Sequence, residues 1–142
     1  MQKMLKGSTL VLLTNYAQAV KNILDFGAIP DLDDVKTAFA NGDAIAAAIH
    51  AANAEGELDR EVYVPADHKF TFMPVSVSGL KDITITVDGL LLASTHHRHY
   101  PVDSRGNVID AILQFSEVDG LKWQGTGVID GQGFMWWQRE YV

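Results

Sequence analysis

The spacing of apolar residues changes once along the chain, near Gly56. From Asp33 to Asn53 apolar residues recur three or four positions apart, which predicts a helix with one buried face, capped by Asp33 or Asp34. Because glycine weakens a helix interior by about 1 kcal/mol, Asn41-Gly42-Asp43 predicts a break or two consecutive helices. The positions predicted to form the buried face are Val35, Ala38, Phe39, Ile45, Ile49 and Ala52.

After Gly56 the pattern has a period of two. Short alternating runs separated by proline and glycine predict short β-strands. Residues 94–107 are polar and include Pro101, so they predict a projecting loop between strands. The predicted strands are 61–64, 69–72, 75–77, 83–87, 111–115 and 121–129.

Two of these segments resemble each other. The segment from Gly79-Leu80-Lys81 to Asp88-Gly89 aligns with the segment from Gly120-Leu121-Lys122 to Asp130-Gly131, with one inserted residue and the triplets 41 positions apart. A period of roughly 20 to 25 residues, or about twice that, with one strand and one glycine turn is typical of stacked solenoid coils. Two unrelated hairpins of a β-sandwich are the alternative.

Composition excludes several classes of protein. The 142 residues predict one domain, and 47% apolar with 20% charged residues are globular values. A net charge of −7 argues against nucleic-acid binding, which needs clustered lysine and arginine. The absence of cysteine excludes disulfides and thiolate metal sites, and no apolar run reaches the ~20 residues of a membrane span.

The first residues predict a separate segment. Lys3 and Lys6 precede the apolar run Leu10-Val11-Leu12-Leu13, and Ala17-Gln18-Ala19 has the small-x-small pattern of a cleavage site. Residues 1–22 are therefore read as a signal-like segment or an N-terminal extension, and a secreted or extracellular location is expected. The alternative is an amphipathic element packed on the domain.

Six features between Ile23 and Trp137 form a recognisable series. They are Leu24-Asp25-Phe26-Gly27-Ala28, Asp31-Leu32-Asp33-Asp34, the alanine-rich helix, Val62-Tyr63-Val64-Pro65-Ala66, the segment 86–94, and Gly125-Thr126-Gly127-Val128-Ile129-Asp130-Gly131-Gln132-Gly133 with Trp136-Trp137. In this order they resemble the N-terminal part of the polygalacturonase family of glycoside hydrolases. The resemblance implies an all-β fold, a right-handed parallel β-helix (a solenoid) with an N-terminal capping helix. Residues 23–142 would then be the N-terminal portion of a single β-helix domain, incomplete at its C-terminal end.

The resemblance also implies a function. The family hydrolyses galacturonan with clustered aspartates, so the expected partner of the parent protein is a polysaccharide, a polyuronide such as pectin. The family's Asn-Thr-Asp, Gly-His-Gly and Arg-Ile-Lys segments are absent from the 142 residues, so we assign no catalytic residue and leave open whether this chain is an enzyme. A noncatalytic saccharide-binding or structural β-helix module and one half of a two-chain enzyme are the alternatives. No cofactor is expected.

Basic and aromatic residues are the candidates for contact with a saccharide. His96-His97-Arg98-His99 could contact an anionic sugar, or could be a solvated loop; four consecutive residues do not suit a metal site, and none is expected. Tryptophans could stack on sugar rings or pack in the core. The candidate substrate contacts are His97, Arg98, His99, Trp136 and Trp137.

The turns of the chain and the open end of the stack are the remaining predicted features. Asp88-Gly89 and Asp130-Gly131 are interpreted as turns in which aspartate bonds the local backbone and glycine has positive φ, and Asp25-Phe26-Gly27-Ala28 as a first short strand and turn, with Phe26 buried. A stack capped at one end exposes strand edges at the other, which predicts self-association or binding of a second chain there. Residues 134–142 could instead fold back as a cap. The residues expected at this contact are Trp123, Val128, Ile129, Phe134, Trp136 and Trp137.

Overall fold

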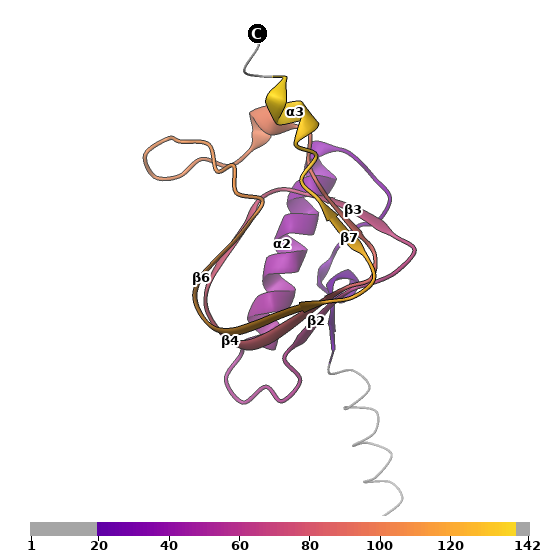
Figure 1. The fold of residues 1–142 in the computed structure, drawn as a ribbon, viewed down its shortest axis with the longest axis vertical. Helices are drawn as coiled ribbons and strands as arrows, with labels where there is room; N and C mark the ends of the chain where they lie inside the picture. The colour runs from indigo at the N-terminus through magenta and orange to yellow at the C-terminus, as the bar shows by residue number, and fades with distance from the viewer. Residues whose placement is uncertain (1–19, 139–142) are drawn as a thin grey trace, which may run out of the picture.

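The computed structural model describes residues 20–138, which form two parallel sheets and one long helix (Figure 1). The predicted signal-like segment lies almost entirely outside the described residues. The first sheet has the order β1 (Lys21–Asn22), β2 (Glu61–Val64), β4 (Val75–Val87) and β6 (Leu113–Gln124). The second has the order β3 (Lys69–Phe72), β5 (Leu90–Ala93) and β7 (Val128–Asp130).

The chain alternates between the two sheets from β2 to β7, and every strand pairing in the described residues is parallel. In Figure 1 β4 nearly overlies β6, and in the second sheet β5 lies between β3 and β7, so successive layers repeat one path. The antiparallel hairpins of a sandwich do not occur among these strands. Mostly parallel strands with few helices are compatible with the parallel β-helix that the resemblance implied.

The register defines the repeat. Glu61 pairs with Thr84, 23 positions later, and Lys69 pairs with Leu90, 21 positions later, which confirms the predicted period of roughly 20 to 25 residues. The next layer is longer, because the loop after β5 lies between the repeated strands: Leu90 pairs with Val128, 38 positions later.

The alignment of the two Gly-Leu-Lys segments, 41 positions apart, therefore differs by three residues from the pairing of β4 with β6. Leu80 pairs with Val118 rather than with Leu121, and Ile83 pairs with Leu121. The glycines do not stack on each other, because the strands are aligned by their buried apolar residues.

Two strands are longer than predicted, and two, the short β1 and β5, were missed. The runs 75–77 and 83–87 join into β4, and the runs 111–115 and 121–124 join into β6, because residues with positive φ bend each strand without ending it. The predicted run 121–129 is divided at Gly125, where φ is 118°. β5 was missed because Leu90–Ala93 is uniformly apolar and has no alternation.

The long helix, α2 (Val35–Ala52), crosses the area enclosed by the strands (Figure 1). Asp34 caps it, as one of the two predicted caps: its Oδ1 accepts a hydrogen bond from the Thr37 amide at 2.9 Å. The predicted break at Asn41-Gly42-Asp43 does not occur. Asn41 and Gly42 are buried, and a Cβ at Gly42 would lie 2.9 Å from the Met73 carbonyl oxygen, so the glycine permits close packing of helix and strand.

The buried face of α2 is largely the predicted one. Ala38, Ile45, Ile49 and Ala52 are buried, but Phe39 is 39% exposed. Phe39 follows Ala38 by about 100° around the helix, which turns its side chain away from the sheets. The prediction for Phe39 was therefore wrong, and Val35 is half-buried.

The segment before α2 also differs from expectation. Residues 25–28 were predicted as a strand and turn, but Ile23–Phe26 forms a 3₁₀-helix, η1, which follows the short β1. Gly27 has the predicted positive φ, 97°, and its amide donates to the carbonyls of η1. Phe26 packs on the edge of the core and is half-buried rather than buried.

Candidate functional site

Residues 94–110 leave the stack between β5 and β6 and project from it, as predicted (orange in Figure 1). The base of this loop belongs to the core. Ser94 and Tyr100 are buried, and the Tyr100 hydroxyl donates to the Ser94 carbonyl at 2.6 Å. Burial raises the pKa of Tyr100, which keeps this phenol protonated as a donor.

The outer part of the loop has its own order. Asp103 Oδ1 accepts hydrogen bonds from the amides of Asn107 and Arg105, at 2.9 and 2.8 Å. The bonds from the Asn107 amide and side chain, and then that from the Arg105 amide, lower the pKa of Asp103. A β-bridge joins Val102 to Val108. These bonds hold residues 102–108 in one conformation.

Two sets of candidate residues meet at this loop. His97–His99 forms a 3₁₀-helix, η2, and Phe134–Trp137 forms the short helix α3. The Trp136 ring packs edge-on against Tyr100 at 5.3 Å between centroids and lies 6.3 Å from the His97 ring. Tertiary structure thus brings together histidine and tryptophan side chains from distant segments.

The candidates differ in exposure. His97 and Trp136 are half-buried and hold α3 on η2, which agrees with a packing role for Trp136. Arg98 and His99 are exposed, and Trp137 is 71% exposed. An exposed guanidinium and an exposed indole on neighbouring segments are the kinds of group that bind an anionic ring compound, with the guanidinium on its carboxylate.

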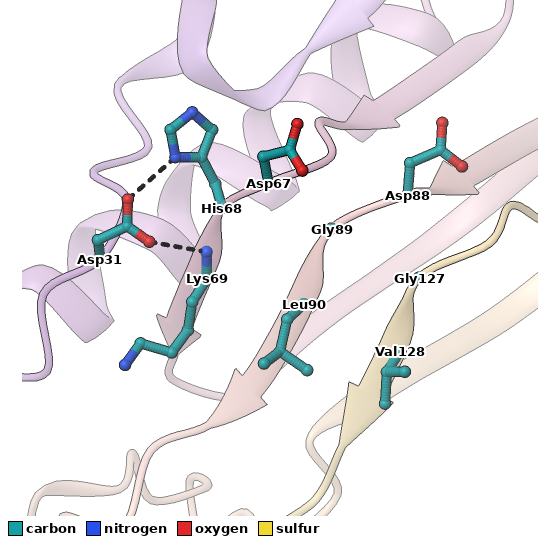
Figure 2. A pocket seen from close by; sticks show the side chains of 9 residues that line it. All are labelled: Asp31, Asp67, His68, Lys69, Asp88, Gly89, Leu90, Gly127 and Val128. Atoms are coloured by element: carbon teal, nitrogen blue, oxygen red, sulfur yellow. Dashed lines mark hydrogen bonds and ion pairs between the residues drawn. The ribbon is translucent and has the colours of Figure 1, made fainter.

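A second feature is a shallow hollow of about 410 Å³ where β3, β5 and β7 begin (Figure 2). His68 Nδ1 lies 2.9 Å from Asp31 Oδ2, and the Lys69 amide donates to Asp31 Oδ1 at 3.0 Å. The bond with His68, then that with the Lys69 amide, lowers the pKa of Asp31. No local pattern indicates this pair, because its members lie 37 positions apart in the sequence. The hollow is lined by Asp31, Asp67, His68, Lys69, Asp88, Gly89, Leu90, Gly127 and Val128.

The two Asp-Gly turns differ from each other. Asp130 Oδ1 accepts from the Gln132 amide at 2.8 Å, the predicted local bond. Asp88 Oδ1 instead accepts from the Thr126 amide at 3.1 Å, so it joins two layers of the stack. Neither Gly89 nor Gly131 has positive φ; Gly89 is needed because a Cβ there would overlap the Pro65 carbonyl oxygen.

In residues 20–138 no three His, Asp or Glu side chains are grouped so as to hold a metal ion. None of the helices there has the length and apolarity needed to cross a membrane.

Comparison with known proteins identifies the chain's relatives at family level. The model of glycosyl hydrolases family 28 matches residues 56–141, which include β2 to β7, the projecting loop and all five candidate contacts. No curated protein and no solved structure gives a significant match. Family match, parallel strands and the motif series agree, and the chain belongs to glycosyl hydrolases family 28, the polygalacturonase family.

Proposed function

We propose that this chain is the N-terminal portion of a polygalacturonase-like glycoside hydrolase that acts on pectin or a related polyuronide. Its residues 23–142 would be the first layers of one right-handed parallel β-helix domain. Family membership and the constant path of the chain between two parallel sheets support this architecture. A secreted location follows from the proposal, because plant cell-wall pectin lies outside the cell.

In this proposal α2 is the cap of the first layers. It contacts β1 and β3, the strands at one edge of each sheet, and it also contacts β2 and β4. An amphipathic helix at that position covers the apolar interior that the first strands would otherwise expose.

One observation supports the saccharide contact: η2 and α3 place Arg98, His99 and Trp137 on neighbouring exposed segments. The Arg98 guanidinium can donate two hydrogen bonds to a uronate carboxylate, and the Trp137 indole offers a flat apolar face to a pyranose ring. His97 and Trp136 then act as positioning residues that hold the two segments together.

In this proposal the site binds saccharide, and none of its residues is given a hydrolytic role. The catalytic segments implied by the family resemblance are absent from the 142 residues, so no catalytic role is assigned to a residue of this chain. A second candidate function is a noncatalytic saccharide-binding module, which the exposed Arg98 and Trp137 would serve equally well. Both functions predict binding of polyuronide, and neither predicts release of reducing ends by the 142-residue protein alone.

Calorimetric titration with oligogalacturonate tests the proposal. We expect binding that weakens with salt, and Arg98→Ala and Trp137→Ala should each lower affinity about tenfold, since a charged hydrogen bond or a stacked ring contributes about 1.4 kcal/mol. Arg105→Ala, an exposed arginine of the same loop, is the matched control and should bind as wild type does. Failure of the wild-type protein to bind, or equal binding by all variants, would contradict the proposed site.

A further inference from the structure

Asn41-Gly42 is the one Asn-Gly pair in the 142 residues, and both of its members are buried inside α2. An asparagine before glycine is chemically reactive, because a residue without Cβ lets its amide nitrogen approach the side-chain carbonyl carbon of the asparagine. The resulting reaction, deamidation through a cyclic succinimide, converts the asparagine into an acid. Residues larger than glycine follow the other four asparagines, Asn15, Asn22, Asn53 and Asn107.

The fold uses both members of this pair. Asn41 Oδ1 accepts a hydrogen bond from the Ile29 amide at 2.7 Å, and Asn41 Nδ2 donates to the carbonyls of Ile29 and Thr71, at 3.1 and 2.7 Å. A Cβ at Gly42 would lie 2.9 Å from the Met73 carbonyl oxygen. The packing of α2 on β3 and on the residues around β3 therefore requires a reactive dipeptide at this point of the chain.

The folded helix protects the pair. Ring closure needs the Gly42 nitrogen to reach Cγ of Asn41, but in an α-helix each amide points along the axis at the carbonyl four residues earlier. Asn41 is 0% exposed, and its three hydrogen bonds hold the side-chain amide on Ile29 and Thr71. Opening of α2 removes both constraints and admits water.

We propose that Asn41 is a deamidation site that reacts only when α2 opens, and that its products do not refold as the intact chain does. The Gly42 amide nitrogen loses its proton to base and forms a bond to Cγ of Asn41, and the side-chain nitrogen leaves as ammonia. Water then opens the succinimide at either carbonyl carbon, so the overall change consumes one water and releases one ammonia. The products are aspartate and isoaspartate at position 41.

Either product removes contacts that the native structure needs. Aspartate has no side-chain N–H, so an ionised carboxylate would face the carbonyl oxygens of Ile29 and Thr71 in a buried site. Isoaspartate adds a methylene group to the backbone of α2, which breaks the helical spacing and displaces Gly42 from Met73. Unfolding of this protein therefore becomes irreversible at a rate set by the chemistry of one residue.

Incubation of the 142-residue protein in guanidinium chloride at mildly alkaline pH tests the proposal. Samples are diluted into buffer at intervals; circular dichroism gives the refolded fraction, and mass spectrometry of peptides gives the fraction of Asn41 that keeps its amide. We expect the two fractions to fall together while Asn53 and Asn107 stay intact. Folded protein at the same pH and temperature should lose the Asn41 amide at least about 100-fold more slowly, because the reaction needs the opened helix.

Two variants separate the chemistry from the fold. Gly42→Ala, compared with wild type only while both are denatured, should lose the Asn41 amide at least about tenfold more slowly, since the added Cβ hinders ring closure. Asn41→Asp, made directly, should show the refolding defect with no incubation in denaturant. Ala47→Asp adds a carboxylate to the exposed face of the same helix and is the control that should refold as wild type does.

Three outcomes would overturn the proposal. They are loss of refolding without conversion of Asn41, full refolding of the deamidated molecules, and equal reaction rates in folded and denatured protein. Saccharide binding is measured separately on freshly folded protein, so each of these outcomes leaves the proposed function standing.

Discussion

Gly120 of β6 lies against Asp82 of β4, and both residues have left-handed backbone conformations, with φ of 89° and 49°. A Cβ at Gly120 would lie 2.6 Å from Asp82 Oδ1. The register between Leu80–Val118 and Ser78–Ser116 sets Gly79, with φ of 74°, beside Glu117, with φ of 51°. At each bend one glycine is stacked on one acidic residue, so adjacent strands turn together.

The bend at Glu117 predicts that glycine has opposite effects on stability at two neighbouring positions. Glu117→Gly should be neutral or stabilising, because it relieves a left-handed conformation that costs a non-glycine residue about 1 kcal/mol. Ser116→Gly, in extended backbone one residue earlier, should destabilise by about 0.5–1 kcal/mol. Urea unfolding of both variants is the measurement, and equal losses of stability would show that the bend at Glu117 is unstrained.

Gly89 predicts a steric effect. In Gly89→Ala the new methyl group meets the carbonyl oxygen of Pro65, which is backbone and cannot rotate away, so the layers must separate locally. We expect a loss of about 2 kcal/mol or more in the free energy of unfolding. Gly133→Ala, where nothing lies within 4 Å of the new Cβ, is the control and should be close to neutral. Thermal unfolding followed by circular dichroism compares them, and similar melting temperatures would rule out the close approach at Gly89.

The buried side-chain amide of Asn41 predicts a larger loss of stability than the Gly89 substitution. Its Oδ1 accepts from the Ile29 amide at 2.7 Å, and its Nδ2 donates to the Thr71 carbonyl at 2.7 Å, so it joins α2 to β3 and to the preceding loop. Asn41→Ala leaves these backbone groups unsatisfied and should cost about 3 kcal/mol. Asp43→Ala, on the exposed face of α2, should change stability little. Chemical denaturation distinguishes them; equal stability of the two variants would disprove the role of Asn41.

Substitution of Ile49 tests whether this face of α2 is buried against the sheets. The side chain is fully buried, so Ile49→Asp places an uncompensated charge in the core and should cost about 4 kcal/mol or prevent folding. Ala47→Asp puts the same residue on the exposed face of the same helix and should leave the fold intact. The readout is the melting temperature, and an unchanged value for Ile49→Asp would mean that this face is solvated.

The helix cap predicts a dependence of stability on pH. The hydrogen bonds from the Thr37 amide and hydroxyl lower the pKa of Asp34 below its usual value of 3.8. The folded state therefore holds the ionised form more strongly than the unfolded state, and this stabilisation is present above pH 3.8 and is lost as pH falls through the folded pKa. The stability difference between wild type and Asp34→Ala should shrink below about pH 3.8.

Urea unfolding at neutral and acid pH measures that difference. Asp33→Ala, which removes the adjacent aspartate and keeps the Asp34 cap, is the matched control for the loss of one carboxylate. A constant difference between wild type and Asp34→Ala at all pH values would contradict the cap as its source.

Local sequence determined some of the elements of this protein, the long helix and the first strands of each sheet after it. The spacing of Ile45 and Ile49 and the capping group of Asp34 fix a helix within one segment, and the alternation in residues 61–64 and 69–72 fixes two strands. The motif series was sufficient to indicate the family, because it depends on residue types in order and not on contacts. These features rest on interactions between neighbours along the chain.

Tertiary structure decided the contacts between layers. By sequence alone Asn41 and Gly42 predict a helix break, but in the folded chain they pack against Thr71 and Met73 and the helix continues. Gly89 likewise reads as a turn residue, whereas in the structure it allows close approach of the Pro65 carbonyl. The register between β4 and β6 was decided by which apolar side chains are buried together. The similarity of the two Gly-Leu-Lys triplets does not contain that information. The meeting of His97 with Trp136, and of Asp31 with His68, likewise depends on how distant segments pack, so no local pattern encodes it.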